Sequence, residues 1–262
     1  MKLSKRVLIM GLPGSGKTTL ASKVKENLKA DWINADKVRK KFNDWDFSYE
    51  GIKRQAIRMR KLADCSKNEI VVADFVAPFP ICIKIFKPHY LVWVDTINKS
   101  RFESMNKIFI KPKHFNLRVD SKDSDLWKIP IIDHFNKFRW NDQNLTTQML
   151  GRFQPFHLGH KLLFYEMLKK NEQVLVMVKD VFKIGDNPFS YMEIKKRIYN
   201  ELKCFSNRFK VIKMPNISII SYGRDVGYKI KKINLPTPIQ KISATKIRKK
   251  LRASGILNSY TK

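Results

Sequence analysis

The sequence Gly11-Leu12-Pro13-Gly14-Ser15-Gly16-Lys17-Thr18 decides the fold of the first part of the chain. It fits the pattern G-x-x-x-x-G-K-[ST], in which glycines let the backbone curl so that several N–H groups point at phosphate oxygens. The motif requires a strand before it and a helix after it. Arg6–Met10 is an apolar run typical of a strand, and Lys17–Leu28 has apolar residues at helical spacing. This stretch therefore predicts a phosphate-binding loop.

Within this loop the sequence predicts contacts to a nucleoside triphosphate. Lys17, a candidate catalytic residue, can reach the β- and γ-phosphates, and the Thr18 hydroxyl can ligate Mg²⁺. The dipole of the following helix adds positive potential. Mg²⁺ is thus the expected cofactor and ATP the expected substrate. The residues predicted to bind phosphate here are Gly11, Gly14, Ser15, Gly16, Lys17, Thr18 and Thr19.

Charged side chains follow the next predicted strand, Asp31–Asn34. A carboxylate at Asp36 can hold Mg²⁺-bound water or accept the proton of an acceptor hydroxyl, which makes it a candidate catalytic residue. The alternative is a helix N-cap, since Asp36 precedes a predicted helix at Lys37–Phe42. Arg39 and Arg58 can supply positive charge to a phosphate or sulfate of the acceptor.

The first half of the chain alternates strand and helix patterns. A long helix is predicted over Tyr49–Cys65, and short strands over Glu69–Asp74 and Tyr90–Asp95. This alternation predicts an α/β fold with a parallel sheet covered by helices on both faces. Residues 111–144 lack the pattern and are interpreted as a connector, with Phe135, Phe138 and Trp140 in a last helix that packs on the first domain.

A second series of strands and helices begins after the connector, so we expect two domains, 1–142 and 143–262. The second is predicted to be a Rossmann-like sheet with a closing helix. Its predicted strands are Thr146–Gly151, Gln173–Lys179, Phe209–Met214 and Ile217–Ser221, and its predicted helices are Leu158–Lys170, Tyr191–Phe205 and Ser243–Arg252.

The stretch Gly151-Arg152-Phe153-Gln154-Pro155-Phe156-His157-Leu158-Gly159-His160 joins the first strand and helix of this series. His157 and His160 are three residues apart, so they lie on one face of the first helical turn. Two imidazole donors at a helix N-terminus can stabilise the α-phosphate of a triphosphate as the phosphorus becomes five-coordinate. A zinc site is the alternative, but no third ligand is evident in the sequence.

A partner motif occurs near the C-terminus, in Ile242-Ser243-Ala244-Thr245-Lys246-Ile247-Arg248. Ser243 is a candidate N-cap, which leaves Thr245 and the first-turn N–H groups for an anion. Arg248, one turn further on, can reach the β- and γ-phosphates. The triphosphate-binding residues predicted in this half are Gly151, Arg152, Phe153, His157, His160, Ser243, Thr245 and Arg248, with His157 and His160 as catalytic candidates.

Two resemblances follow from these motifs. The first 110–120 residues resemble adenylylsulfate kinase through Gly11–Thr18, Asn34–Arg39, Phe47-Ser48, Val71–Pro78 and Val92–Thr96. This resemblance implies transfer of the γ-phosphate of ATP to the 3′-hydroxyl of adenylylsulfate, with Asp36 and Arg39 as site residues and Asp36 as the base. The acceptor side departs from the family, since its Asp-Gly-Asp is Asn34-Ala35-Asp36 here.

Residues 146–252 resemble the H-x-G-H nucleotidylyltransferases through Gly151–His160, Asn187-Pro188-Phe189 and Ile242–Arg248. The nicotinamide-mononucleotide adenylyltransferases and related cytidylyltransferases are the most similar branch. The resemblance implies transfer of a nucleoside monophosphate from ATP or CTP to a phosphorylated acceptor, with release of pyrophosphate. Gly223-Arg224-Asp225 leaves sulfate activation open, because sulfate adenylyltransferases of the same superfamily carry a Gly-Arg-Asp.

Composition limits the remaining classes. The net charge of +30 is spread along the chain, so we expect small phosphorylated or sulfated partners, while a polynucleotide kinase or repair protein is the alternative. The three cysteines form no C-x-x-C pair, so neither a zinc site nor a disulfide framework is predicted. No apolar run approaches the ~20 residues of a membrane span, and the expectation is a cytoplasmic enzyme, with a homo-oligomer left open.

Overall fold

The protein is described from a computed structural model, which covers residues 4–169, 173–221, 223, 229–230 and 232–257. The chain divides into two compact units, Met1–Lys137 and Phe138–Lys262. Each unit is α/β and contains one parallel sheet, as the alternation of strands and helices predicted. Over the described ranges no helix combines the length and apolar character needed to cross a membrane.

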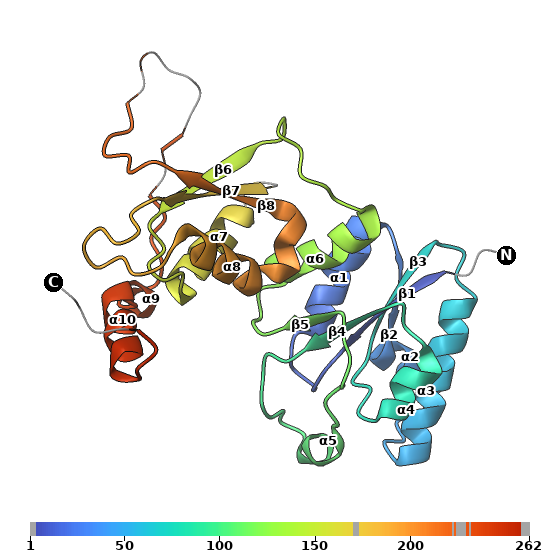
Figure 1. Ribbon diagram of the computed structural model, residues 1–262. Helices are drawn as coiled ribbons and strands as arrows, with labels where there is room; N and C mark the ends of the chain where they lie inside the picture. Colours follow the sequence, from blue (N-terminus) through green and yellow to red (C-terminus); the bar gives the residue numbers. More distant parts are fainter. Residues whose placement is uncertain (1–3, 170–172, 222, 224–228, 231, 258–262) are drawn as a thin grey trace. The chain divides into compact units, whose positions relative to one another are not determined.

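The sheet of the first unit has five parallel strands in the order β2-β3-β1-β4-β5 (Figure 1). The strands are β1 (Lys5–Met10), β2 (Asp31–Asn34), β3 (Ile70–Asp74), β4 (Tyr90–Val94) and β5 (Leu117–Val119). The helices are α1 (Lys17–Leu28), α2 (Ala35–Phe42), α3 (Tyr49–Asp64), α4 (Pro80–Phe86), α5 (Glu103–Ile108) and α6 (Ser124–Asn136). Because all strands run the same way, the loops at their carboxyl ends gather at one edge of the sheet.

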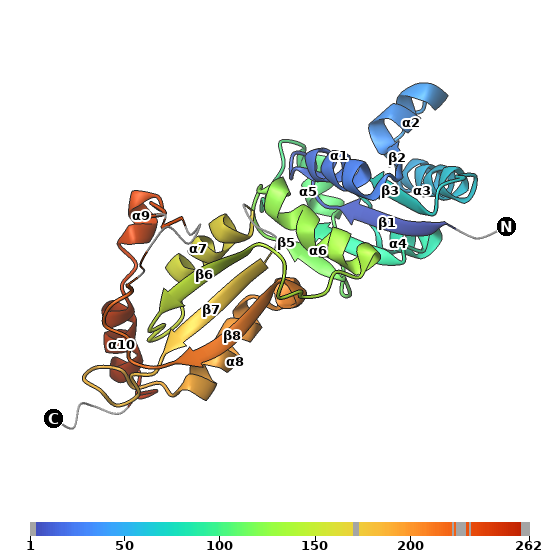
Figure 2. The ribbon, with the colours of Figure 1, turned by 90° about the horizontal axis from the view of Figure 1, so that it is seen from above.

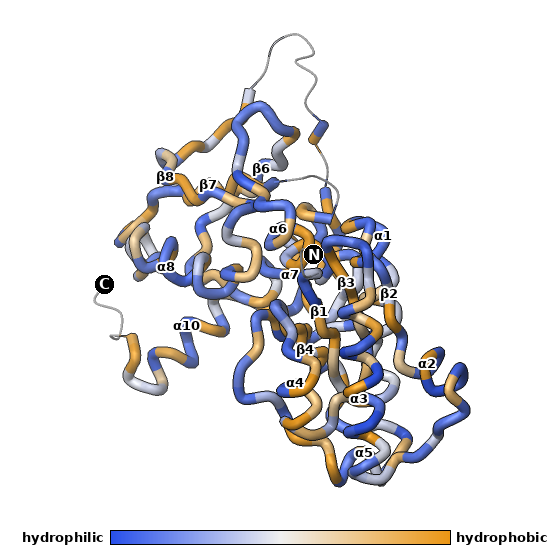
Figure 3. The backbone as a smooth tube through the Cα atoms, turned by 90° about the vertical axis from the view of Figure 1, so that its right-hand side faces the viewer, coloured by the Kyte–Doolittle hydropathy of each residue, from blue (hydrophilic) through white to orange (hydrophobic). Residues whose placement is uncertain are grey.

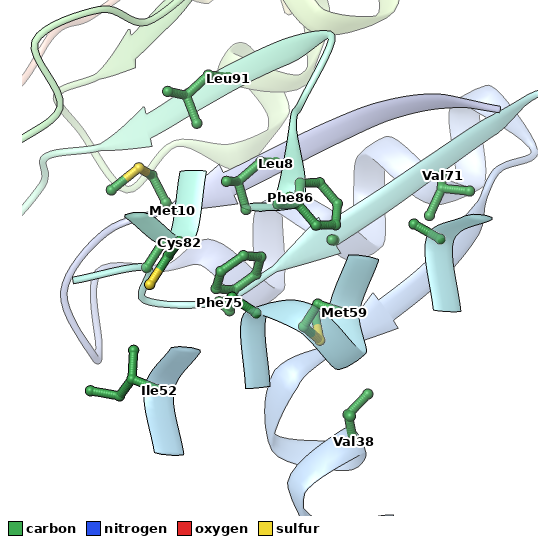
Figure 4. Close-up of a cluster of buried hydrophobic side chains, with 14 of the residues drawn as sticks. Leu8, Met10, Val38, Ile52, Met59, Val71, Phe75, Cys82, Phe86 and Leu91 are labelled. Carbon is green, nitrogen blue, oxygen red and sulfur yellow. The ribbon is translucent and has the colours of Figure 1, made fainter. Parts of the chain in front are cut away.

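The core of the first unit explains why its central strands β3, β1 and β4 are mostly apolar. Helices cover both faces of a parallel sheet, so nearly every position of these three strands is buried. Strand β1 is fully buried from Val7 to Met10 and is among the hydrophobic stretches of Figure 3. On one face Leu8 and Met10 meet Met59 of α3 and Phe86 of α4 (Figure 4).

Helix α6 matches only part of the last helix predicted with Phe135, Phe138 and Trp140: it contains Phe135 and packs in the first unit, but it runs from Ser124 to Asn136. The helix runs through Pro130, which lacks the backbone donor that an interior helical position uses. Three buried side chains of α6, Leu126, Trp127 and Ile131, hold it in the core, where it packs against α1. Tertiary burial outweighs the local cost of the proline.

The second unit has a sheet of three parallel strands in the order β6-β7-β8 (Figure 2). The strands are β6 (Thr146–Gly151), β7 (Gln173–Lys179) and β8 (Phe209–Met214). The helices are α7 (Leu158–Leu168), α8 (Tyr191–Glu201), the 3-10 helix Lys203–Arg208, α9 (Thr237–Gln240) and α10 (Ala244–Ala253). Phe164, Phe205 and Phe209 pack together in its core, which places α7 and the 3-10 helix against β8.

Two sequence predictions are wrong here. Ile217–Ser221 is not a strand: the Ile217 N–H donates to the carbonyl of Pro215 at 2.8 Å, which is a tight turn rather than a ladder bond. Phe138 and Trp140 do not continue the last helix of the first unit. They belong to the second unit, where the Phe138 ring lies 3.4 Å from the Arg208 guanidinium and the Trp140 ring 4.9 Å from the Lys210 ammonium.

Candidate active sites

The phosphate-binding loop lies between β1 and α1, where the sequence predicted it. Gly11, Gly14 and Gly16 all have positive φ, of 148°, 79° and 98°. Only glycine adopts such angles without strain, and at Gly11 a side chain would also collide with the carbonyl oxygen of Val94. The loop conformation therefore depends on these glycines. Thr19 is exposed in the first turn of α1.

Two side chains of this loop are buried. Lys17 donates from Nζ to the carbonyl of Leu12 at 2.8 Å, and burial lowers its pKa to about 8, against the opposing charges of Asp74 and Asp36. The Ser15 hydroxyl is fully buried and, among the described residues, has no hydrogen-bond partner. The anionic oxygens of a triphosphate could accept hydrogen bonds from both the Ser15 hydroxyl and the Lys17 ammonium, as expected of a phosphate-binding loop.

Asp74, at the carboxyl end of β3, completes this site and was not among the predicted site residues. Its Oδ2 accepts from the Thr18 hydroxyl at 2.8 Å, and its Oδ1 accepts from Nε1 of Trp32 at 2.7 Å. Burial raises the pKa of Asp74, while the bonds from Thr18, Trp32 and Asn34 oppose that rise. A hydroxyl beside a carboxylate is the hard oxygen donor set that Mg²⁺ prefers, so Thr18 and Asp74 fit the expected ion.

Asp36 lies in the first turn of α2, exposed to solvent. The N-cap of α2 is Asn34, whose Oδ1 accepts from the Lys37 N–H at 3.0 Å, so the alternative of an N-cap at Asp36 is wrong. Burial lowers the pKa of both Lys17 and Arg39, and the negative charge of Asp36 opposes that lowering. Asp36 follows the carboxyl end of β2, at the same edge of the parallel sheet as the phosphate-binding loop.

The two predicted acceptor residues are held by the segment between α2 and α3. Arg39 is buried and donates from one amino group to the carbonyls of Asp44 and Asp46, at 3.0 and 2.9 Å. Arg58 pairs with the Asp44 carboxylate at 2.6 Å. Both guanidiniums also lie over aromatic rings, Arg39 over Phe47 and Arg58 over Phe42. They therefore organise an exposed aromatic surface, and their contact with an acceptor stays a prediction.

The histidine turn, Gly151–His160, connects β6 to α7. His157 is the N-cap of α7, and its ring stacks on that of His160 with centroids 3.8 Å apart. Phe153 lies edge-on to His160 at 5.0 Å, in a left-handed conformation with φ of 52°. A Cβ at Gly151 would come within 2.8 Å of the Phe153 ring, so this glycine makes room for it.

Hydrogen bonds define the tautomer of both imidazoles. Nδ1 of His157 accepts from the Gly159 N–H at 3.1 Å, and Nδ1 of His160 accepts from the His157 N–H at 3.3 Å. A neutral imidazole that accepts at Nδ1 carries its proton on Nε2. Burial keeps both rings neutral, since it lowers the pKa of His160 to about 3 and also lowers that of His157. The turn thus presents two Nε2–H donors.

Gln154 ties this turn to the loop after β7. Its Nε2 donates to the Phe189 carbonyl at 2.7 Å, and its Oε1 accepts from the Phe189 N–H at 2.9 Å. This two-way bond brings Asn187-Pro188-Phe189 beside the histidine turn. Both stretches were recognised as motifs in the sequence, but no pattern there indicates that Gln154 joins them.

The partner motif begins α10. Ser243 takes the N-cap position without a side-chain cap bond, and Thr245 is exposed. Arg248 is buried and donates to the Gln154 carbonyl, to the Asp186 carboxylate at 2.8 Å and to the Thr245 hydroxyl at 3.2 Å. The structure therefore brings the motif to the histidine turn. Arg152 is exposed beside it, and Arg224 and Asp225 lie outside the described residues.

The described side chains contain no cluster of three or more His, Cys, Asp or Glu that could hold a metal ion, and none of the described cysteines is bonded in a disulfide. The zinc alternative for the histidine pair accordingly gains no support. Fold and sites together define a class: an α/β protein with a P-loop domain in its N-terminal part and a second strand-to-helix junction, the histidine turn, in its C-terminal part.

The comparisons with known proteins sharpen this class. Residues 7–75 match the family model described as an AAA domain. A nicotinamide-nucleotide adenylyltransferase of Sulfurisphaera tokodaii is 31% identical in an alignment of 132 residues that covers 38% of this chain and 74% of that protein. Another, of Methanothrix thermoacetophila, is 28% identical over 71 residues, or 26% of this chain and 42% of that protein. The chain belongs to the nicotinamide-nucleotide adenylyltransferase family.

Solved structures give weaker likenesses. An APS kinase of Mycobacterium tuberculosis in complex with AMPPNP and APS has a TM-score of 0.43 and 22% identity, covering 52% of this chain and 99% of that one. Shikimate kinase from Aquifex aeolicus has a TM-score of 0.38 and 16% identity, covering 50% of this chain and 96% of that one. Such scores are too low to carry an argument.

Proposed function

We propose that the chain is a bifunctional transferase of phosphorus-containing groups, with one reaction in each unit. The second unit transfers a nucleoside monophosphate from ATP to a phosphorylated small molecule, of which nicotinamide mononucleotide is the first to test. The first unit transfers the γ-phosphoryl group of ATP to a small hydroxyl-bearing acceptor. Membership of the adenylyltransferase family supports nucleotidyl transfer by the second unit and favours ATP over CTP. The P-loop domain supports phosphoryl transfer by the first unit.

The observation that carries the proposal is the pair of neutral, stacked imidazoles at the start of α7. In nucleotidyl transfer, an oxygen of the acceptor phosphate attacks the α-phosphorus. The bond from phosphorus to the bridging oxygen of the β-phosphate breaks, and pyrophosphate leaves with that electron pair. Charge grows on the α-phosphate oxygens meanwhile, and two Nε2–H donors stabilise it without giving up a proton.

The first unit contains the parts that phosphoryl transfer needs. Lys17 lies on the loop and, when ATP binds, exchanges its bond to the Leu12 carbonyl for phosphate oxygens. Thr18 and Asp74 would hold Mg²⁺, which neutralises the β- and γ-phosphates when bound. Asp36, which follows β2 at the same edge of the sheet as the phosphate-binding loop, is the proposed base for the acceptor hydroxyl.

Pyrophosphate release tests the proposal for the second unit. The full chain is given ATP or CTP with nicotinamide mononucleotide, sulfate or simple phosphorylated alcohols. We expect release with ATP and nicotinamide mononucleotide, and a fall of about 10²-fold in kcat for His160→Ala, the range for removing one donor to a transition-state oxyanion. Release only with sulfate would replace this proposal by sulfate activation, and release with no acceptor would reject it.

A further inference from the structure

Helix α10 concentrates positive charge beside the histidine turn. Its sequence, ATKIRKKLRA, contains five basic residues and no acidic one. Arg248 and Arg252 are one turn apart on the same face, so their like charges repel. A helix of this kind needs a negative group from elsewhere in the fold to hold it in place.

Asp186, in the loop between β7 and α8, supplies that negative group. Its Oδ2 accepts from Nε of Arg248 at 2.8 Å, and its Oδ1 accepts from an amino group of Arg252 at 2.7 Å. The side chains are well shielded, with Arg248 10%, Arg252 19% and Asp186 22% exposed. Shielding from solvent strengthens such charge-assisted bonds.

The same guanidinium links Asp186 to the histidine turn. Arg248 also donates to the backbone carbonyl of Gln154, whose side chain is bonded at both ends to Phe189. One carboxylate therefore connects three segments that are far apart in sequence: the loop after β7, the turn before α7 and the start of α10.

We propose that Asp186 is a positioning residue of the second unit, which holds Arg248 and Arg252 in place to receive the β- and γ-phosphates of a nucleoside triphosphate. This inference rests on the proposed function of the unit. Asp186 acts through the arginines, because each of its carboxylate oxygens accepts from a guanidinium and its negative charge repels a phosphate. Its contribution is largest before the triphosphate binds, since the triphosphate then adds negative charge of its own.

The test is Asp186→Asn in the full chain, assayed by pyrophosphate release with ATP and nicotinamide mononucleotide. We expect the KM for ATP to rise about tenfold, as for the loss of ~1.4 kcal/mol of binding, while kcat stays within about twofold. Asp186→Glu should restore part of the lost affinity. Asp180→Asn is the matched control, because Asp180 is nearby in sequence and pairs with Lys213 at 3.1 Å on an exposed surface; its KM should be unchanged.

Equilibrium binding of ATP, measured in the Lys17→Ala background so that only the second unit binds, separates this inference from the proposed function and serves if turnover is absent. Weaker binding by Asp186→Asn, with no pyrophosphate from the wild type, would reject the function and keep the positioning role. Turnover by the wild type with an unaltered KM in Asp186→Asn would reject the positioning role, and a fall in kcat without a change in KM would assign Asp186 to the chemical step instead. If Asp186→Asn does not fold, Arg252→Gln keeps the Arg248 bond and should raise the KM by a smaller factor; no rise would overturn the inference.

Discussion

At the scale of single residues, the histidine turn shows how a fold selects a protonation state. The two backbone N–H groups at the start of α7 point at Nδ1 of each ring, so the proton must be on Nε2. Burial removes the charged form as an alternative. Sequence spacing predicted that His157 and His160 share a face, but the tautomer follows from hydrogen bonds that only the folded turn makes.

Burial of His160 predicts how the stability of the second unit depends on pH. Its pKa is about 3 in the folded unit and 6.5 ordinarily, so between these values the unfolded chain binds a proton that the folded unit does not. Neutral His160 therefore makes its full contribution to the free energy of unfolding above pH 6.5. Below that pH the free energy of unfolding falls by up to about 1.4 kcal/mol per pH unit for one group. Urea unfolding at pH 7, 6 and 5 measures it, and His160→Gln should flatten the dependence. An equally steep fall in that variant would contradict the buried, neutral imidazole.

Asp74 gives a second prediction at this scale. Its carboxylate, together with Thr18, is placed to ligate Mg²⁺, and Asp74→Asn keeps the shape while removing the charge. We expect at least tenfold more Mg²⁺ to be needed for half-maximal binding of ATP to the first unit, measured by titration with a fluorescent ATP analogue. Asp95→Asn is the control, because Asp95 follows strand β4 of the same sheet but pairs with Arg118. An unchanged Mg²⁺ requirement in Asp74→Asn would show that the metal binds elsewhere.

At the scale of helices and strands, periodicity predicted the elements that bury a regular apolar face. The strands β1, β3, β4, β6 and β7 and the long helices α1 and α3 were predicted within a few residues. The sequence failed where tertiary contacts decide the outcome. The extent of α6 was missed because Pro130 argues against a helix interior. The apolar pattern of Ile217–Ser221 predicted a strand, but these residues pair with no described strand and are exposed.

The sites were predictable to the same extent. Motif spacing identified the residues of both strand-to-helix junctions, because backbone geometry there constrains residue type. Asp74 and Asp186 were not predicted as site residues, because a single carboxylate has no spacing pattern of its own. The signal for Asp74 was an acid ending the apolar strand Ile70–Asp74, but Asp186 had none before the fold was known.

Helix α8 supplies a prediction at the element scale. Ser190 and Glu193 form a capping box: the Ser190 hydroxyl accepts from the Glu193 N–H, and the Glu193 carboxylate accepts from the Ser190 N–H at 2.7 Å. Ser190→Ala should lower the free energy of unfolding of the second unit by about 1 kcal/mol, as other lost caps do. Chemical denaturation measures this loss, and Ser254→Ala, at an exposed helix C-terminus, should change it little. Equal stability of Ser190→Ala and wild type would contradict the cap.

At the scale of the whole molecule, we propose that each of the two units binds its own triphosphate with different groups. The first unit offers a glycine loop and a buried lysine, and the second offers paired imidazoles and an arginine-bearing helix. The positive charge of +30 suits polyanionic substrates in both units. Each unit has its own sheet and core, so a substitution in one site should leave the other site active.

The stoichiometry of Mg²⁺-ATP binding tests this account most directly, because it needs no knowledge of either acceptor. Isothermal titration should find two sites per wild-type chain and one site in Lys17→Ala. The double variant His157→Ala/His160→Ala should also retain one site, and the two sets of changes combined should leave none. A single site in the wild type, or loss of both sites through Lys17→Ala alone, would contradict the claim that each unit binds its own triphosphate.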